Sequence, residues 1–574
     1  MQHTSFRLAR NHAPWLLATV FFGVSVWLTA GQEPEHGQQL FVFALLLCTF
    51  GVFLFAFGRV AFALGLSGGL FLLLRALTVL KQEYLESPLM PADFVYYVRS
   101  SLFETLSRYP HLYGMGIAVC VLGPLLLWLL WHFDVRLFAA ASRARRGALR
   151  IGGVVLAVAA FWLCMLPKGP FAAVHDRGVW EKMSDDAELS DFFVNFDDSR
   201  ISLPPMADTA SAERDWQDTA SGLPGTAKAP YPDIIEVLEE STFDPSDFDA
   251  CTVPACHVAM LGTDAMTRGH GYLRVHTFGG GTWVSEFAAL TGMPHDIFGP
   301  GGAYAPFVLA PHVRDSLPRQ LQRLGYLTVA IYPTHSNFLN GRDAYKGYGV
   351  DHLYGAEQLG LDDWEETDTQ MFTAAKRVYD GLEKAGLRKP AQPVFMMILT
   401  INQHGPHDDP MSTLPKPFQN LLHGLPADTA LNFDTYLQRL HDSDTGMAQL
   451  EHDFLQRGEP TLLAHFGDHQ PSFNSLIRAI PRHLPAALRP IQDYITYYSI
   501  KTNFDTPALP NYPSLDLAFL PGMMLQAAGL PGDAYFAASR QLRERCQGRY
   551  TDCPQRELLK SYHAWIFGQL HVYQ

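Results

Sequence analysis

Five long apolar runs in the first third of the chain constrain its fold more than any other feature. They cover residues 13–30, 39–57, 60–80, 114–133 and 151–166. Each run is long enough, or nearly so, for a helix to cross the ~30 Å hydrocarbon core of a bilayer. Runs so uniformly apolar and so closely spaced are poor candidates for core helices of a soluble protein. We therefore predict a transmembrane domain with five spans over residues 1–166.

Basic residues indicate the orientation of this domain. Arg7 and Arg10 precede the first run, and a basic cluster between Arg136 and Arg150 follows the fourth. Because Lys and Arg collect on the cytoplasmic side, both segments are expected inside. Five spans then carry everything after residue 166 across the membrane. We expect a multi-pass protein of the inner (cytoplasmic) membrane, with its soluble domain in the periplasm or outside the cell.

Residues 167–230 have the composition of a connector, and residues 231–574 that of a soluble domain. Short apolar strands are expected at 234–238, 272–277, 327–332, 394–401, 462–466 and 494–500, and helices at 314–324, 369–385, 433–455 and 515–528. This alternation predicts an α/β domain with a mainly parallel sheet between helices. The net charge of -14, without a basic stripe, argues against a nucleic-acid partner.

Four cysteines of the soluble part form two close pairs, Cys251 with Cys256 and Cys546 with Cys553. In a domain placed outside the cytoplasm, such pairs favour two short disulfides. A zinc site is the alternative, but the spacings lack the usual two-residue gap between ligands.

Polar residues of one chemical kind follow several of the expected strands. Glu239 and Glu240 follow the first strand, His404 follows the fourth, and Asp468 and His469 follow the fifth. The carboxyl ends of parallel strands meet at one edge of a sheet, where function collects. Carboxylate and imidazole groups together are common ligands of one divalent ion. The pattern therefore indicates a metal site, with either glutamate as its first ligand.

A glycine run, Gly279 to Gly281, leads into Thr282 and a helix-like segment that Gly292 should end. This places a hydroxyl at a helix N-terminus, beside bare backbone that an anionic group can approach. A threonine becomes a useful nucleophile only when a metal or a base removes its proton. The plain alternative is that Thr282 only caps the helix. After the third strand, Arg342 is a candidate clamp for a phosphate.

Together these motifs resemble the alkaline phosphatase/sulfatase superfamily, and within it the lipoteichoic acid synthase-like phosphoglycerol transferases. The resemblance covers nearly the whole chain, and Glu-Ser, Gly-Gly-Gly-Thr-x-x-x-Glu-Phe, Asn-x-His and Gly-Asp-His occur in family order. It implies that Glu240, Thr282, Asp468 and His469 bind one divalent cation. Manganese is the expected ion, with magnesium or zinc as alternatives. Thr282 would be the nucleophile.

The same resemblance implies that His404 and Arg342 hold the phosphate or the headgroup. The family places a substrate-binding histidine soon after the third strand, where Tyr332 aligns in this chain and His335 lies nearby. Both are therefore candidate substrate-binding residues, and headgroup specificity stays open.

The expected function is transfer of phosphoglycerol from a phospholipid such as phosphatidylglycerol to a glycan or polymer acceptor, through a phosphothreonine. One alternative is a phosphoethanolamine transferase with zinc. A sulfatase-like phosphodiesterase or other hydrolase is a second. A catalytically inactive membrane scaffold that binds glycan is a third, and the full set of metal ligands argues against it.

Overall fold

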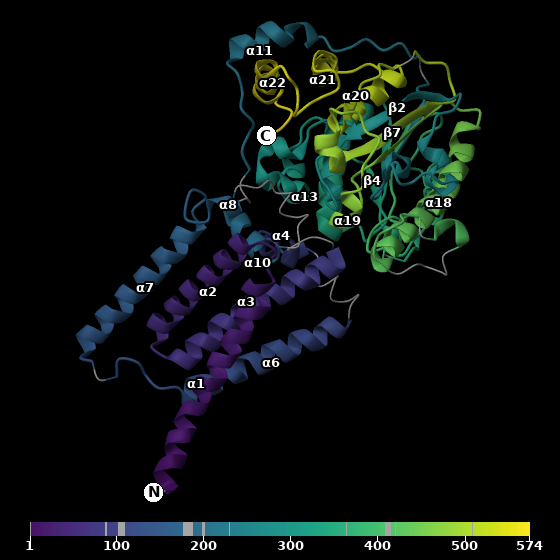
Figure 1. The fold of residues 1–574 in the computed structure, drawn as a ribbon. Helices are drawn as coiled ribbons and strands as arrows, with labels where there is room; N and C mark the ends of the chain where they lie inside the picture. Colours follow the sequence, from purple (N-terminus) through teal and green to yellow (C-terminus); the bar gives the residue numbers. More distant parts are fainter. Residues whose placement is uncertain are drawn as a thin grey trace. The chain divides into compact units, whose positions relative to one another are not determined.

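The computed structural model describes residues 2–85, 89–100, 110–139, 141–175, 187–197, 201–228, 230–362, 364–407, 415–419, 421–507 and 509–574. The chain separates into two compact units, Met1–Ser199 and Arg200–Gln574 (Figure 1). This division falls inside the segment 167–230 that the sequence marks as a connector. The finer domain limits at residues 166 and 230 stay predictions. Each unit is described below by itself.

The first unit is built from long apolar helices. They are α1 (Gln2–Leu28), α2 (His36–Phe57), α3 (Val60–Leu85), α6 (Pro110–Phe133) and α7 (Arg143–Met165). Shorter helices are α4 (Asp93–Ser100), α8 (Ala172–His175) and α10 (Leu189–Val194). Among the described residues, five helices are long and apolar enough to cross a membrane, which confirms the predicted spans.

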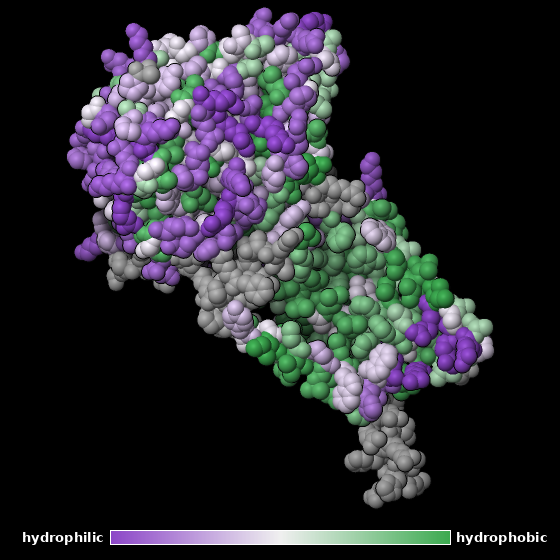
Figure 2. All heavy atoms as spheres, turned by 180° about the vertical axis from the view of Figure 1, so that it is seen from behind, coloured by the Kyte–Doolittle hydropathy of each residue, from purple (hydrophilic) through white to green (hydrophobic). Residues whose placement is uncertain are grey.

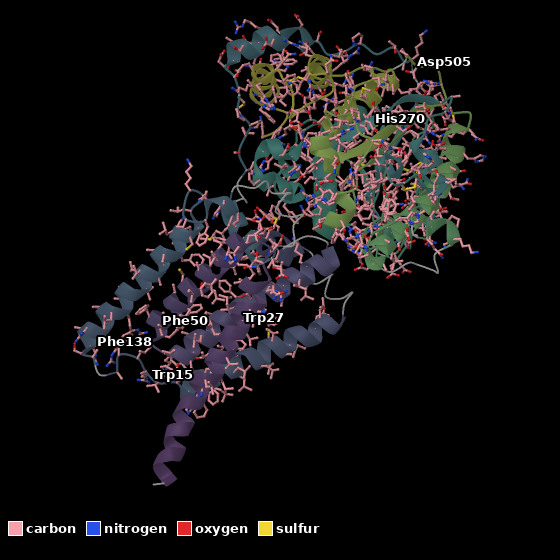
Figure 3. The ribbon with its side chains drawn as sticks, viewed as in Figure 1. Trp15, Trp27, Phe50, Phe138, His270 and Asp505 are labelled. Atoms are coloured by element: carbon pink, nitrogen blue, oxygen red, sulfur yellow. A yellow bond between two sulfur atoms is a disulfide. The ribbon has the colours of Figure 1, made fainter. Side chains whose placement is uncertain are left out.

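The surface of this unit is apolar rather than polar. Its helices appear green in Figure 2, while the second unit is largely purple and white. Leu156 on α7, for example, is 72% exposed. Large aromatic side chains such as Trp15, Trp27 and Phe50 line the helices in Figure 3. A water-soluble protein rarely exposes so continuous an apolar surface, so this unit is a membrane domain whose surface contacts lipid.

The second unit is an α/β domain around one eight-stranded sheet, of strand order β4-β3-β5-β1-β6-β7-β2-β8. The strands are β1 (Asp233–Glu239), β2 (Thr267–Arg274), β3 (Leu327–Ile331), β4 (His352–Tyr354), β5 (Val394–Leu399), β6 (Thr461–Gly467), β7 (Ile495–Thr502) and β8 (Leu515–Asp516). Only β7 runs antiparallel to its neighbours, β6 and β2. The expected mainly parallel sheet is confirmed.

Helices cover both faces of this sheet. The longer ones are α11 (Thr209–Trp216), α12 (Thr282–Thr291), α14 (Leu317–Arg323), α15 (Gly341–Tyr348), α17 (Asp368–Gly381), α18 (Ala427–Leu455), α20 (Leu520–Ala527), α21 (Ala534–Arg545) and α22 (Arg556–His563). The shortest are α13 (Ala305–Val308), α16 (Ala356–Leu359) and α19 (Ser475–Arg478). α17 and α18 pack on one face, while α14 contacts β3 and α20 contacts β6 and β7.

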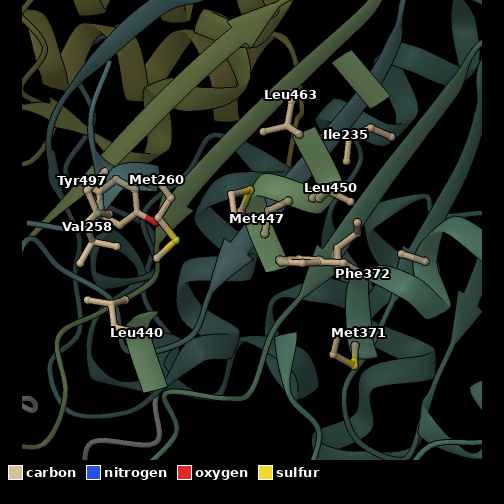
Figure 4. Packing of buried hydrophobic residues seen from close by; sticks show 14 of the residues in the cluster. Ile235, Val258, Met260, Met371, Phe372, Leu440, Met447, Leu450, Leu463 and Tyr497 are labelled. Atoms are coloured by element: carbon tan, nitrogen blue, oxygen red, sulfur yellow. The ribbon is translucent and has the colours of Figure 1, made fainter. Parts of the chain in front are cut away.

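Alternation along β1 explains how the sheet serves two helical layers. Ile235 and Val237 belong to the core under α17 and α18, which Figure 4 shows around Ile235, Leu450 and Leu463. Successive strand residues point to opposite faces, so Glu236 points away from this core. Its side chain is fully buried, and neither carboxylate oxygen has a hydrogen-bond partner.

Two expectations about this unit need correction. The short edge strands β4 and β8 were not predicted, because three and two residues carry too little periodicity to be recognised. Residues 515–528 were expected to form one helix, but they begin as β8 and become helical only afterwards. Both cysteine pairs form disulfides, Cys251 with Cys256 and Cys546 with Cys553, as predicted.

Candidate active site

The ends of β1 and β6 bring the acidic motifs together. The two strands are parallel neighbours, with Glu239 in register with Gly467, so Glu240 and Asp468 emerge side by side. Gly467 allows this close approach, because an added Cβ would lie 1.9 Å from the carbonyl oxygen of Thr242. A side chain at position 467 would therefore push the two strand ends apart.

The glycine run delivers Thr282 to the same place. Gly279, Gly280 and Gly281 have φ angles of 66°, 156° and 85°, a region that side chains rarely adopt. Gly281 occupies the cap position of α12, and Thr282 is its first helical residue. The capping hypothesis for Thr282 is therefore wrong. The predicted end of this helix at Gly292, in a left-handed conformation, is confirmed.

The Thr282 hydroxyl contacts the predicted metal ligands and does not cap the backbone of α12. Its hydroxyl donates to Glu240 Oε2 over 2.9 Å, and its Oγ1 lies 3.4 Å from His469 Nε2. His469 Nε2 also lies 3.2 Å from Asp468 Oδ2 and 3.4 Å from Glu240 Oε1. Glu240, Asp468 and His469 are buried, while Thr282 is half-buried. The structure thus brings all four residues into one cluster, with the Thr282 hydroxyl directed at Glu240 and His469.

The donor set of this cluster fits a divalent cation. His469 Nδ1 lies 2.9 Å from the carbonyl oxygen of Gln470, so Nδ1 carries the hydrogen and the neutral ring turns its Nε2 lone pair to the cluster. Asp468 Oδ1 accepts from two backbone N–H groups, but the buried Oδ2 has no hydrogen-bond partner. Burial and the Glu240 carboxylate raise the pKa of Asp468 well above its usual range. A cation relieves this convergence of acceptor atoms.

Glu239, the alternative ligand, points to the other side of the strand. Its Oε2 accepts from the Thr400 hydroxyl over 3.1 Å, and its Oε1 lies 3.6 Å from His465 Nε2. The hydroxyl of Tyr497 contacts the same His465 nitrogen. Asp368 lies against Glu239, and burial followed by this neighbouring charge raises the pKa of Asp368 well above its usual range. The structure therefore places Glu240, and not Glu239, in the cluster with Thr282.

The loop after β3 carries the other phosphate-binding candidates. Arg342 donates to the Ser336 hydroxyl over 2.6 Å and to Asn337 Oδ1 over 3.1 Å, and its side chain is 58% exposed. His335 is partly exposed in the same loop. Tyr332 is 6% exposed and packs against other side chains, so it is the least accessible of the candidates. All three lie at the same sheet edge as Thr282, two strands away from β1.

His404 lies on the loop after β5. Its Nδ1 lies 2.7 Å from the carbonyl oxygen of Gly405, so Nδ1 carries the hydrogen and Nε2 is the ring nitrogen that a ligand can reach. The loop is held from below: Asp368 Oδ1 accepts from the N–H of Asn402, and Arg439 donates to the His404 carbonyl oxygen over 2.9 Å.

Trp364 is a residue that sequence reasoning missed. It belongs to the acidic run 362–366, which is expected from its charges to be a solvated loop. Instead Glu366 is buried, and the Trp364 ring lies 5.0 Å from the rings of both His404 and Phe338. A tryptophan inside an acidic run was the available signal, because a solvated loop has no need of a large aromatic residue.

An ion triad, in which His276 and Asp516 are buried and Asp296 is partly exposed, anchors the start of the glycine run. His276 Nδ1 lies 3.0 Å from Asp296 Oδ2, and its Nε2 lies 3.1 Å from Asp516 Oδ1. Burial opposes a charge on His276, but the two carboxylates outweigh it and raise its pKa to about 10. The charged imidazole therefore fixes the end of the segment that leads to Gly279.

Comparison with known proteins gives a family for this domain. The sequence profile of the Sulfatase family matches residues 232–507. A Haemophilus influenzae protein of uncharacterized function is 28% identical over 554 residues, covering 94% of this chain and 96% of the relative. A Rhizobium meliloti protein named for cyclic beta-1,2-glucan modification is 25% identical and covers 69% of this chain and 61% of the relative.

Solved structures to which this chain is similar include the Streptococcus pyogenes phosphoglycerol transferase GacH in complex with sn-glycerol-1-phosphate, with 16% identity, a TM-score of 0.48, and coverage of 65% of this chain and 99% of that one. They also include the lipooligosaccharide phosphoethanolamine transferase A of Neisseria meningitidis, with 12% identity, a TM-score of 0.48, and coverage of 88% and 95%. Residues 232–507 are therefore similar to the Sulfatase family, in agreement with the resemblance of the motifs to the alkaline phosphatase/sulfatase superfamily.

Proposed function

We propose that this protein is a membrane-anchored, metal-dependent phosphoglycerol transferase. Its donor is a phospholipid, phosphatidylglycerol, and its acceptor is a glycan or polymer outside the cytoplasm. The observation that carries the proposal is the position of Thr282. Its hydroxyl lies at the N-terminus of α12 and within hydrogen-bonding distance of a buried, acceptor-rich cluster. A cluster of this kind activates a hydroxyl that is otherwise a poor nucleophile.

The ligands would be Glu240, Asp468, His469 and Thr282 itself. A divalent cation bound there, with manganese expected and magnesium or zinc as alternatives, lowers the pKa of the Thr282 hydroxyl and offsets charge on the transferring phosphoryl group. The three oxygen donors and one nitrogen donor suit any of these ions, so the metal is to be identified by measurement.

Two displacements complete the transfer. In the first, Thr282 Oγ1, oriented by its hydrogen bond to Glu240, forms a bond to the headgroup phosphorus and loses its proton to solvent. The bond from phosphorus to the diacylglycerol oxygen breaks, and that oxygen takes up a proton from solvent. In the second, an acceptor hydroxyl attacks the phosphothreonine, releasing Thr282 and passing it a proton. The partial positive charge at the N-terminus of α12 favours the anionic group in both steps.

His404 and Arg342 are proposed to hold the headgroup and its phosphate, with His335 and Tyr332 as further candidates on the same side. Arg342 is preoriented by Ser336 and Asn337, which reduces the entropy lost when it binds an anion. The acceptor class is supported by two relatives from Rhizobium meliloti, whose names concern cyclic beta-1,2-glucan modification and capsular polysaccharide biosynthesis.

The membrane anchor agrees with a lipid donor. We propose that the helical unit lies in the inner membrane and that residues 231–574 face the periplasm or the cell exterior. The two disulfides support this side of the membrane, because such bonds form and persist in oxidising compartments.

The deciding experiment uses the full-length protein in vesicles with labelled phosphatidylglycerol. Thr282→Ala should abolish release of diacylglycerol and the labelled phosphothreonine, lowering the rate by about a thousandfold or more. Thr291→Ala is the matched control, since its hydroxyl lies on the same helix and donates to the carbonyl oxygen of Phe287. Release at the wild-type rate from the Thr282 variant would refute the mechanism.

Parallel assays separate this function from its rivals. Faster release from phosphatidylethanolamine than from phosphatidylglycerol would identify a phosphoethanolamine transferase. Release of free glycerol phosphate to water at the same rate in the absence of any acceptor would identify a hydrolase. No turnover of either lipid, with the metal bound, would favour an inactive scaffold.

A further inference from the structure

The aromatic contacts of Trp364 reach two loops that carry phosphate-binding candidates, the one after β3 with Arg342 and the one after β5 with His404. Its ring packs edgewise against Phe338, which lies just before Arg342, and against His404, with interplanar angles of 88° and 74°. Trp364 and Phe338 are each half-buried, so part of this aromatic surface is accessible. The wall formed by Trp364, Phe338 and His404 therefore borders the space where the phosphate-binding candidates lie.

The backbone at Trp364 is strained. Its φ of 74° lies in the left-handed region, which is unfavourable for a bulky residue. Such a conformation persists only where the surroundings determine it, and it is concentrated at functional sites. Glu366 helps to hold the loop, because its buried carboxylate accepts from the N–H of Asp362. The loop thus keeps the indole against His404, although the Trp364 backbone would by itself prefer a negative φ.

The wall combines an apolar face with one hydrogen-bond acceptor. His404 Nδ1 lies 2.7 Å from the carbonyl oxygen of Gly405 and donates to it, so Nε2 is the ring nitrogen left to bind a ligand. A hydroxyl group can donate to that nitrogen while the adjacent C–H groups pack on the indole. A short polyol phosphate such as glycerol phosphate has both features. A bare phosphate has neither the C–H groups nor a neutral hydroxyl.

We propose that Trp364 is a specificity-determining residue, which binds the polyol part of the donor headgroup together with His404. This inference rests on the proposed function for the identity of the donor. The acidic run that contains Trp364 thereby gains a binding role. Trp364 and His404 would recognise the polyol, whereas Arg342 would recognise the phosphate.

The test measures ligand binding rather than lipid turnover, so that it can fail independently of the proposed function. Full-length protein in detergent, loaded with Mn²⁺, is titrated calorimetrically with glycerol 1-phosphate, with phosphoethanolamine and with inorganic phosphate. Trp364→Gly is the main variant, because glycine adopts the observed φ without strain and preserves the loop. It should weaken glycerol 1-phosphate binding about tenfold while changing phosphate binding less than twofold.

Two further variants separate recognition from folding. Trp364→Phe retains an aromatic wall and should restore most of the glycerol 1-phosphate affinity. Tyr231→Ala removes a comparable aromatic contact, since the half-buried Tyr231 ring lies 6.4 Å from that of Tyr326, before the starts of β1 and β3 and so at the opposite edge of the sheet. It should leave both affinities unchanged.

Three results would overturn the inference. An equal loss of glycerol 1-phosphate and phosphate affinity in Trp364→Gly would show that Trp364 only maintains the fold. Equal wild-type affinities for the two ligands would show that the wall contacts no headgroup. A loss confined to phosphoethanolamine would show that the aromatic wall binds an ammonium group. Failure of phosphatidylglycerol turnover, with these affinities as expected, would instead refute the proposed function alone.

Discussion

Glu239 and Glu240 are neighbours in the chain, yet they lie in two chemically different clusters. Around Glu239, Oε2 accepts from the Thr400 hydroxyl, Oε1 has no hydrogen-bond partner, and the Tyr497 hydroxyl contacts the neighbouring His465 ring. Around Glu240, the hydroxyls of Ser241 and Thr282 donate to the two carboxylate oxygens, and Asp468 Oδ2 and His469 Nε2 lie against the same group. Among the described residues, only the Glu240 cluster gathers two carboxylates and an imidazole closely enough to hold a metal ion. The difference shows that the convergence of ligand atoms, rather than residue type, distinguishes the proposed ligand Glu240 from its neighbour Glu239.

The largest expected effect comes from replacing these two glutamates by glutamine, one at a time. Glu240→Gln should lower diacylglycerol release by about a thousandfold and weaken Mn²⁺ binding by ten- to a hundredfold, because it removes a charged ligand. Glu239→Gln should leave Mn²⁺ affinity within about threefold of the wild type. Calorimetric titration with Mn²⁺ measures both. Equal losses of metal affinity in the two variants would erase the distinction.

The residues around Glu239 should contribute to stability rather than to metal binding. Asp368→Ala leaves buried backbone N–H groups at Ile401 and Asn402 without their acceptor. We expect a loss of about 2–3 kcal/mol in the free energy of unfolding of the second unit, with Mn²⁺ affinity unchanged. Thermal unfolding of the full-length protein, followed by tryptophan fluorescence, checks this. A drop in metal affinity without a drop in stability would contradict the division between the two clusters.

Glu236 offers a third carboxylate, with neither kind of partner. Burial raises its pKa to about 8. Below pH ~4.5 the group is neutral in both states, and between there and pH 8 the unfolded state ionises while the folded state keeps its proton. The cost to folding therefore grows through this window. Glu236→Met should stabilise the protein by about 2 kcal/mol at pH 7.5 and by less at pH 5.

Unfolding temperatures at several pH values measure this gain. Glu236→Gln is the matched control, because it keeps a polar group but cannot titrate, and it should remove the pH dependence. A gain that is the same at pH 5 and pH 7.5 would show that packing rather than ionisation is responsible.

The His276 triad should give a smaller effect with the opposite sign. The pKa of His276 is raised above its unfolded value of about 6.5, so its stabilising contribution is complete below pH 6.5 and disappears as the pH rises toward 10. Because Asp296 is partly exposed, we expect His276→Gln to cost only about 1–2 kcal/mol at pH 6 and almost nothing at pH 10. A cost that stays constant across this range would rule out the ion triad.

Much of this architecture could be predicted from the sequence, because the signals were long or redundant. The five apolar runs and the alternation of strands with helices need no tertiary information. The residues of the cluster could be named because strand ends of a parallel sheet converge. By contrast, the choice between Glu239 and Glu240 depends on the side of β1 to which each side chain points. Two adjacent residues of the same type give no sequence signal for that direction.

Trp364 shows the complementary limit. Its contacts join three loops that are distant in sequence, and no local pattern specifies which aromatic residue fills a space between loops. Thr282 was ambiguous for a similar reason. A helix-start threonine caps its own backbone in most settings, and only the position of Glu240 diverts the hydroxyl.

The glycine run before Thr282 has a consequence for chirality. Three successive residues occupy backbone angles that suit the mirror image of a natural amino acid. Natural mutation can supply only L-residues, and an L side chain at any of these three positions is sterically unfavourable. We therefore expect single substitutions in the segment before Thr282 to be poorly tolerated. A semisynthetic protein with D-alanine at position 281 would meet no such barrier. The segment that delivers the nucleophile therefore depends on the one genetically encoded residue that has no handedness.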